Sequence, residues 1–286
     1  MKIYSLEKKD TDFTRELLDI VAEKALGQPG FYTLLAADED DIPVGVLQFF
    51  VGTSKEHGTI IGRVTYIFVV PTERENGVAE GLLLEMTGIM RDSGISLCEV
   101  AVPDNEETEI IKYAFSAFGF SFDKKDEFPY YEISIGEIFG HHVLSPNRFG
   151  DIKPLSELRQ SQYKYLFGEI KRHESEDILA EDVSPRLEDW DQDVSCFYIG
   201  DKGCGAFLLC RREEKILEPK YLAGFGRDVS ASILGLISYG AQSAKQKYPE
   251  DTIIRISGRK ERVKELLKKM CPGITPKKMS VGKINI

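Results

Sequence analysis

The stretch Arg63-Val-Thr-Tyr-Ile-Phe-Val-Val-Pro-Thr-Glu-Arg-Glu-Asn-Gly-Val-Ala-Glu-Gly-Leu-Leu-Leu-Glu-Met-Thr-Gly-Ile-Met90 decides the fold of this chain. Its first part, Val64 to Val70, is a nearly continuous run of β-branched and aromatic residues, which predicts a strand buried on both faces. Pro71 ends that strand. Beyond the turn, apolar residues recur at helical spacing, so we expect a helix that begins near Asn76 or Gly77 and buries one face.

The junction between strand and helix, residues 74–79, is where we expect ligand chemistry. The first turn of a helix leaves backbone N–H groups without intrahelical partners, and the small residues Gly77 and Ala79 do not cover them. The helix dipole adds about 0.3–1 kcal/mol in favour of an anion at this end. A single glycine after such a strand would only cap an ordinary βα turn, so the prediction depends on the wider pattern.

The wider pattern, Val69-x-Pro71-x-x-Arg74-x-x-Gly77-x-Ala79-x-x-Leu82-Leu83, resembles the pyrophosphate-binding signature of the GNAT N-acetyltransferase superfamily. The resemblance implies an α+β fold with a mixed sheet, the GNAT acyl-CoA N-acyltransferase fold, and acetyl-CoA as co-substrate held by backbone amides. In that family the preceding strand pairs with the pantetheine arm as an added strand would. The residues that the resemblance places at the cofactor are Phe68, Val69, Val70, Arg74, Glu75, Asn76, Gly77, Val78, Ala79 and, in a later loop, Asn105.

The flanking segments complete this fold in the order that the resemblance implies. We expect strands at 1–10, 31–37, 43–51, 95–102, 120–122 and 130–135, and helices at 11–26 and from about 105 to Gly119. We take residues 1–140 as the first domain, a GNAT acetyltransferase domain with the acyl-CoA loop.

Two positions depart from the family's pattern. The family often has a tyrosine four residues before a Gly-Phe pair, whose hydroxyl can protonate the departing thiolate; here Phe115 holds that place before Gly119, and Tyr113 should face elsewhere on the helix. No carboxylate lies in the central strand, where many relatives keep a general base. Glu99 in the next strand is the nearest candidate, and a salt bridge is the alternative for it. The sequence therefore leaves the catalytic residues unknown.

The same order of expected helices and strands recurs, with a weaker pattern, after residue 140. This repeat predicts a tandem arrangement with a second domain at 141–286. Its expected elements are helices at 154–172, 230–248 and 259–270 and strands at 193–200, 204–211, 216–225 and 251–257, with Gly205 in the place of Gly45. Where the cofactor loop should recur, Asp228 puts a like charge near any pyrophosphate. We therefore expect a degenerate GNAT-like domain, with Arg227 binding some other anion as the alternative.

Composition limits the remaining function classes. Residues 1–140 contain 12 Lys+Arg and 26 Asp+Glu, whereas residues 141–286 contain 25 and 21. An acidic first half repels nucleic acid and modestly favours a cationic amine, although acidic surface also simply keeps a protein in solution. The N-terminus lacks the apolar core of a signal peptide and no stretch reaches the ~20 apolar residues of a membrane span, so we expect a cytoplasmic protein without membrane partners.

Metal and redox chemistry are not indicated. The five cysteines form no Cys-x-x-Cys pair and mostly sit among apolar neighbours, so we expect buried thiols. His57 lies in a glycine-flanked loop and His141-His142 in a linker without a third ligand, so we expect no metal site.

These observations predict an N-acetyltransferase that moves an acetyl or acyl group from acetyl-CoA to a primary amine of a small molecule or peptide. The alternative is a non-catalytic acyl-CoA-binding sensor or assembly module, which the missing tyrosine and the missing strand carboxylate favour. Extended edge strands make a homodimer plausible.

Overall fold

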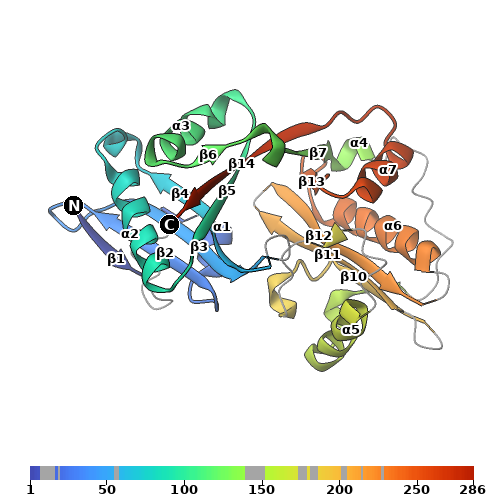
Figure 1. Ribbon diagram of the computed structural model, residues 1–286. Helices are drawn as coiled ribbons and strands as arrows, with labels where there is room; N and C mark the ends of the chain where they lie inside the picture. The colour runs from blue at the N-terminus through green and yellow to red at the C-terminus, as the bar shows by residue number, and fades with distance from the viewer. Residues whose placement is uncertain are drawn as a thin grey trace. The chain divides into compact units, whose positions relative to one another are not determined.

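The computed structural model describes residues 1–6, 17–18, 20–54, 58–138, 152–172, 179–180, 186–200, 205–213, 215–226 and 229–286. The chain forms two compact units, each a mixed sheet flanked by helices (Figure 1). Unit 1 contains Met1–Glu127 and Lys278–Ile286, and unit 2 contains Phe128–Lys277. No described helix is both long and apolar enough to cross a bilayer.

Unit 1 is built on a sheet with the strand order β1 (Lys2–Ser5), β2 (Phe31–Ala37), β3 (Pro43–Thr53), β4 (Ile60–Val69), β5 (Leu97–Pro103) and β14 (Lys277–Asn285). Neighbouring strands are antiparallel except β4 and β5, which run parallel. The short β6 (Ser121–Phe122) pairs with β14. The helices are α1 (Ile20–Ala25), α2 (Val78–Asp92) and α3 (Glu109–Phe118), with 3-10 turns η2 (Pro71–Glu73), η3 (Glu106–Thr108) and η4 (Lys124–Asp126).

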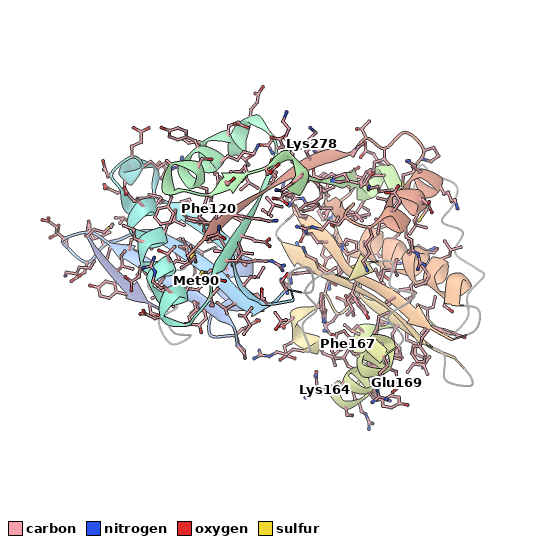
Figure 2. All side chains as sticks on the ribbon, viewed as in Figure 1. Met90, Phe120, Lys164, Phe167, Glu169 and Lys278 are labelled. Carbon is pink, nitrogen blue, oxygen red and sulfur yellow. The ribbon has the colours of Figure 1, made fainter. Side chains whose placement is uncertain are left out.

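Helices α2 and α3 cover one face of this sheet and form its main core. Leu82 and Met86 of α2 and Phe49 of β3 are fully buried there, and burial of such side chains contributes about 1.5–3 kcal/mol each. Met90 and Phe120 belong to the same cluster (Figure 2). A smaller cluster around α1 covers the opposite face, so the sheet is sandwiched as the helical periodicity predicted.

Unit 2 repeats this layout. Its strand order is β8 (Ile152–Pro154), β10 (Cys196–Ile199), β11 (Gly205–Glu213), β12 (Ile216–Phe225), β13 (Ile253–Ser257) and β7 (Phe128–Ser134), with β9 (Leu179–Ala180) beside β12. Helices α6 (Val229–Lys247) and α7 (Glu261–Met270) cover one face, and α5 (Gln160–Arg172) the other. The remaining turns are α4 (Ile135–Ile138), η5 (Leu155–Glu157) and η7 (Leu187–Asp189). The predicted internal repeat is therefore present in the topology.

The last strand of each unit comes from the other half of the sequence. Strand β7 follows the elements of unit 1 along the chain but pairs with β13 in unit 2, whereas β14 at the C-terminus pairs with β5 in unit 1. Figure 1 shows the C-terminus at the sheet of unit 1. The contacts thus divide the chain after residues 127 and 277 instead of at the expected boundary of 140. Strand β14 had no sequence prediction, because its glycine and lysines interrupt the apolar alternation.

Two details differ from the sequence analysis. Strand β4 is mostly half-buried instead of buried on both faces, because β5 leaves its edge. Gly205 is not the structural counterpart of Gly45: a Cβ at Gly45 would meet α2, whereas one at Gly205 would meet Leu166 of α5 on the opposite face.

Candidate functional site

The candidate site begins where strands β4 and β5 separate. The two strands pair only at Gly62 with Cys98, Arg63 with Glu99 and Val64 with Val100. Strand β4 then continues to Val69 without another partner on that side among the described residues. One edge of β4 therefore has no strand partner beyond Val64 among the described residues, and the backbone groups on it can face a ligand, although the Val69 carbonyl oxygen already accepts one hydrogen bond from Arg74 Nε.

Residue alternation decides which backbone groups face the open edge. The Val70 N–H donates to the Val44 carbonyl oxygen at 2.9 Å, and the Phe68 carbonyl oxygen lies against Gly45, so both residues face β3. In an antiparallel pair the residues between them point their N–H and C=O groups the other way. Val69 therefore faces the open edge, and so does Ile67. Of the three predicted strand residues, only Val69 presents backbone groups there, and Ile67 was missed because the alternation could not be anchored without the register.

A β-bulge marks the point of separation. Gln48 of β3 lies opposite Tyr66 and Phe49 lies opposite Val64, which leaves Thr65 as an extra residue in β4. The Thr65 hydroxyl donates to the Gln48 carbonyl oxygen at 3.2 Å. Gln48 is itself buried, and its Nε2 donates to the Ala22 carbonyl oxygen at 2.9 Å. Buried hydrogen bonds therefore hold the bulge in place.

The N-terminus of α2 lies beyond the end of β4 and is not capped. Gly77 adopts the left-handed conformation at φ 78°, and no side chain caps the helix. The first amide to bond back is Gly81 N–H, to the Gly77 carbonyl oxygen at 2.9 Å. No described residue accepts from the N–H groups of Gly77, Val78, Ala79 or Glu80. A Cβ at Gly77 would meet nothing within 4 Å, so no protein atom fills the space beside residue 77, and helix N-termini with unpaired N–H groups favour anions.

Gly45 sets how closely α2 approaches the sheet. A Cβ at this position would lie 2.7 Å from Val78 Cγ1, the first residue of the helix. The helix can therefore start directly over β3 only because residue 45 lacks a side chain. This packing fixes the uncapped amides relative to the end of β4.

Arg74, Glu75 and Asn76 form the loop that joins β4 to α2. The Arg74 Nε donates to the Val69 carbonyl oxygen at 3.2 Å, and the Asn76 Nδ2 donates to Glu73 Oε2 at 3.1 Å. Glu75 has φ 69°, an uncommon conformation for a residue with a side chain. Its exposed carboxylate and that of Glu80 lie in sequence beside the free amides, where they oppose an anion electrostatically.

Asn105 has a structural role of its own. Its Oδ1 accepts from the Thr108 N–H at 3.0 Å, which caps η3 before α3 begins. The residue is exposed. Its predicted contact with the pantetheine stays a prediction.

Phe115, which replaces the tyrosine that the resemblance would place here, and Glu99, the candidate base, are both buried. Phe115 is 1% exposed and packs edge-to-face on Phe120 at 5.0 Å, whereas Tyr113 is 75% exposed. Glu99 is buried, with Arg63 Nε at 3.6 Å and Lys283 Nζ at 3.8 Å. The salt-bridge alternative for Glu99 therefore describes its position.

The four cysteines that the structure describes are buried. Burial raises the pKa of Cys98 to about 12, which disfavours the nucleophilic thiolate. Cys196, Cys210 and Cys271 are buried as well, as expected, while Cys204 lies outside the described residues. No metal-type cluster occurs in the described part of the chain, and His57, His141 and His142 lie outside it.

The equivalent edge in unit 2 is occupied. Strand β12 pairs with β13 only at Ile216 and Leu217, and β11 covers its other edge along the whole length. The short strand β9 pairs antiparallel with Tyr221 and Leu222, so it lies on the edge that β13 has left. In unit 2, strand β9 of the chain itself thus occupies the edge that is open in unit 1. Arg227 and Asp228 lie outside the described residues.

Comparison with known proteins was informative for structure alone. No family model and no curated protein matches the sequence. A tandem GNAT protein from the clavulanic acid biosynthesis pathway superposes with a TM-score of 0.65, covering 99% of this chain and 98% of that one at 11% identity. The chain has a tandem GNAT fold.

Other solved structures superpose on almost the whole of this chain. A probable N-acyltransferase from Enterococcus faecalis superposes with a TM-score of 0.57 at 14% identity, covering 98% of this chain and 72% of that one. A GCN5-related N-acetyltransferase from Kribbella flavida gives a TM-score of 0.56 at 9% identity, covering 98% and 70%. At these identities the likeness is one of fold, and it extends across both units.

Proposed function

We propose that unit 1 binds an acyl-CoA, with acetyl-CoA as the expected form, and transfers the acyl group to a primary amine. The observation that carries this proposal is the open edge of β4 leading to the uncapped N-terminus of α2. An acyl-CoA has matching parts, because its extended amide-containing arm joins a doubly charged diphosphate to a thioester.

Each part of the ligand has a binding group in this arrangement. The diphosphate would accept hydrogen bonds from the amides of Gly77 to Glu80, with the helix dipole favouring its charge. The amide-containing arm would pair with the backbone of Ile67 and Val69, as an added strand does. The thioester would then lie near the bulge at Thr65, where the strands separate.

The proposed acyl transfer needs few catalytic side chains. Holding an amine against the thioester carbonyl supplies most of the rate enhancement, since well-oriented pairs reach effective molarities on the order of 10⁵ M. Backbone N–H groups of the open edge would stabilise the developing oxyanion. Because Phe115 offers no hydroxyl, the departing thiolate would take its proton from water or another group.

Isothermal titration of the full chain with acetyl-CoA and with CoA tests binding, and absence of heat at millimolar ligand would count against the proposal. Thiol release from acetyl-CoA across polyamines, aminoglycosides and amino acids then tests transfer. The acceptor class, a small molecule or peptide amine, is read from the amine that raises thiol release above the amine-free rate.

A second candidate function is a non-catalytic acyl-CoA sensor. The buried ring of Phe115 and the ion pairs of Glu99 favour it, because the two expected proton-transfer positions are occupied by packing and salt bridges. Acyl-CoA binding without any amine-dependent thiol release is the result that this alternative predicts.

A further inference from the structure

Unit 1 contains a row of three charged side chains across neighbouring strands. Arg63 of β4 lies opposite Glu99 of β5, and Glu99 lies opposite Lys283 of β14. The Glu99 carboxylate is 3.6 Å from Arg63 Nε and 3.8 Å from Lys283 Nζ. Lys283 Nζ also donates to Asp126 Oδ1 at 2.9 Å. The charges along the row are positive, negative, positive.

Unit 2 contains a corresponding row with the charges inverted. Arg255 of β13 lies opposite Glu132 of β7, with Nε 2.8 Å from Glu132 Oε1. Its Nη1 is 3.8 Å from Glu218 Oε1 on β12. Lys277 Nζ adds a bond to Glu132 Oε2 at 2.5 Å. The charges along this row are negative, positive, negative.

The two rows occupy the same place in their sheets. In unit 1 the first residue of β5, Leu97, pairs with the last of β14, Asn285. In unit 2 the first residue of β13, Ile253, pairs with the last of β7, Ser134. We call β5 and β13 the inner strands, and β14 and β7, which pair with them, the outer strands. Glu99 and Arg255 each lie two residues after the first residue of their inner strand. Lys283 and Glu132 each lie two residues before the last residue of their outer strand.

We propose that these inverted charge rows make the chain exchange its outer strands between the units. If each half kept its own outer strand in the same register, Glu132 would lie opposite Glu99, and Lys283 opposite Arg255. Like charges directly opposite on neighbouring strands are destabilising, and such pairs discriminate by opposing the wrong partner. The exchanged pairing brings opposite charges together in both sheets.

Burial gives this discrimination its strength. The side chains of Glu99, Glu218 and Glu132 are only 7%, 11% and 14% exposed, so solvent and salt screen them weakly. In the retained pairing Glu99 would keep Arg63 on β4 but would lose Lys283 and face a second carboxylate, and this weakly screened repulsion opposes that pairing. The device acts on strand pairing and is independent of ligand binding.

Cysteine pairs that form only in one pairing provide the test. Val281 lies opposite Ala101 in the exchanged sheet, and Tyr130 is placed relative to Glu132 as Val281 is relative to Lys283. Ala101→Cys with Val281→Cys therefore reports exchange, and Ala101→Cys with Tyr130→Cys reports retention, with the disulfide identified by peptide mapping of the oxidised full chain. We expect the first disulfide to dominate in the parent sequence.

The deciding variant swaps the two outer charges, Glu132→Lys with Lys283→Glu. We expect the 101–130 disulfide to replace the 101–281 disulfide as the major product. The neutral control, Glu132→Gln with Lys283→Gln, should give both products because the discrimination is removed. An unchanged 101–281 yield in the charge-swapped variant would overturn the proposal.

A second measurement covers the case in which the swapped variant does not fold. Lys283→Glu should lower Tm by at least about 3 °C more than Lys283→Gln, and that gap should become smaller in a Glu99→Gln background, where only the repulsion from Asp126 remains. Equal Tm values for Lys283→Glu and Lys283→Gln in the parent background would contradict the proposal.

Discussion

The Arg74 guanidinium donates from Nε to the carbonyl oxygen of Val69, 3.2 Å away. This bond joins the loop before α2 to the open edge of β4, so it links the two parts of the candidate site. The remaining guanidinium nitrogens stay available to an anion, because Arg has five N–H donors. Arg74, which matches the first residue of the GNAT loop signature, thus holds the loop against β4 in this chain.

Replacing Gly77 with aspartate should remove acyl-CoA binding. The new carboxylate would lie beside the free amides of α2, and we expect the Kd to rise by about 100-fold or more, equivalent to ~2.7 kcal/mol. Gly94→Asp is a matched control, because Gly94 also has positive φ with nothing near its Cβ position but follows the other end of α2. Titration calorimetry measures the affinity of both variants for acyl-CoA. Equal affinities of Gly77→Asp and Gly94→Asp would show that the loop is misassigned.

Replacing Glu75 with asparagine should tighten binding. Asparagine tolerates the left-handed conformation that Glu75 adopts, and the change removes a negative charge next to the diphosphate. We expect affinity for CoA to rise about 3- to 10-fold at low salt and less at 0.5 M salt, where the Debye length falls to a few ångströms. Equal affinities of variant and parent at low salt would place the diphosphate elsewhere.

The chain should bind one acyl-CoA and not two. Unit 1 leaves the β4 edge open, whereas β9 occupies the corresponding edge of β12 at Tyr221 and Leu222. Calorimetric titration of the full chain should therefore give a stoichiometry near one site per chain, and Gly77→Asp should abolish all of it. Two sites, or a residual site in that variant, would show that β9 can be displaced.

Restoring the family's tyrosine at position 115 should not restore a proton donor. The Phe115 ring is 1% exposed and packed on Phe120, so the new hydroxyl would be buried. An unsatisfied buried hydroxyl costs about 1–3 kcal/mol, and we expect Phe115→Tyr to lower Tm with no gain in kcat. Phe115→Leu is the control for lost packing alone. A higher kcat in Phe115→Tyr would show that the hydroxyl reaches the thiolate.

Strand β4, helix α2 and the turn between them could be predicted from the sequence, because each depends on residues that are close together in the chain. The β-branched run, Pro71 and the helical spacing fixed β4 and α2, and Gly77 proved to hold the left-handed conformation at the start of α2. The unpaired N–H groups at the start of α2 follow from the absence of a capping side chain. Residue alternation was harder, since Ile67 and Val69 could be separated from Phe68 only once the β3 register was known.

Most features that the sequence could not predict depend on residues far apart in the chain. Strand β14 pairs with β5, which is about 180 residues away in the chain. The spacing of apolar residues within a segment does not indicate so distant a partner. The two-residue β9 is too short to have a pattern. The ion pairs of Glu99 depend on Lys283, so its sequence neighbourhood alone could not decide between a base and a salt bridge.

Glu132 should contribute stability that is lost in acid. Burial opposes its ionisation, but hydrogen bonds from Lys277 and Arg255 outweigh this, so its pKa lies below the usual value of 4.5. Because the unfolded chain then takes up this proton at higher pH than the folded chain, the contribution is complete above about pH 4.5 and disappears as pH falls through the folded pKa. Urea unfolding between pH 7 and pH 3 should show Glu132→Gln less stable than the parent at pH 7, with the difference shrinking below pH 4.5. A constant difference between Glu132→Gln and the parent across the range would assign the effect of this substitution to packing.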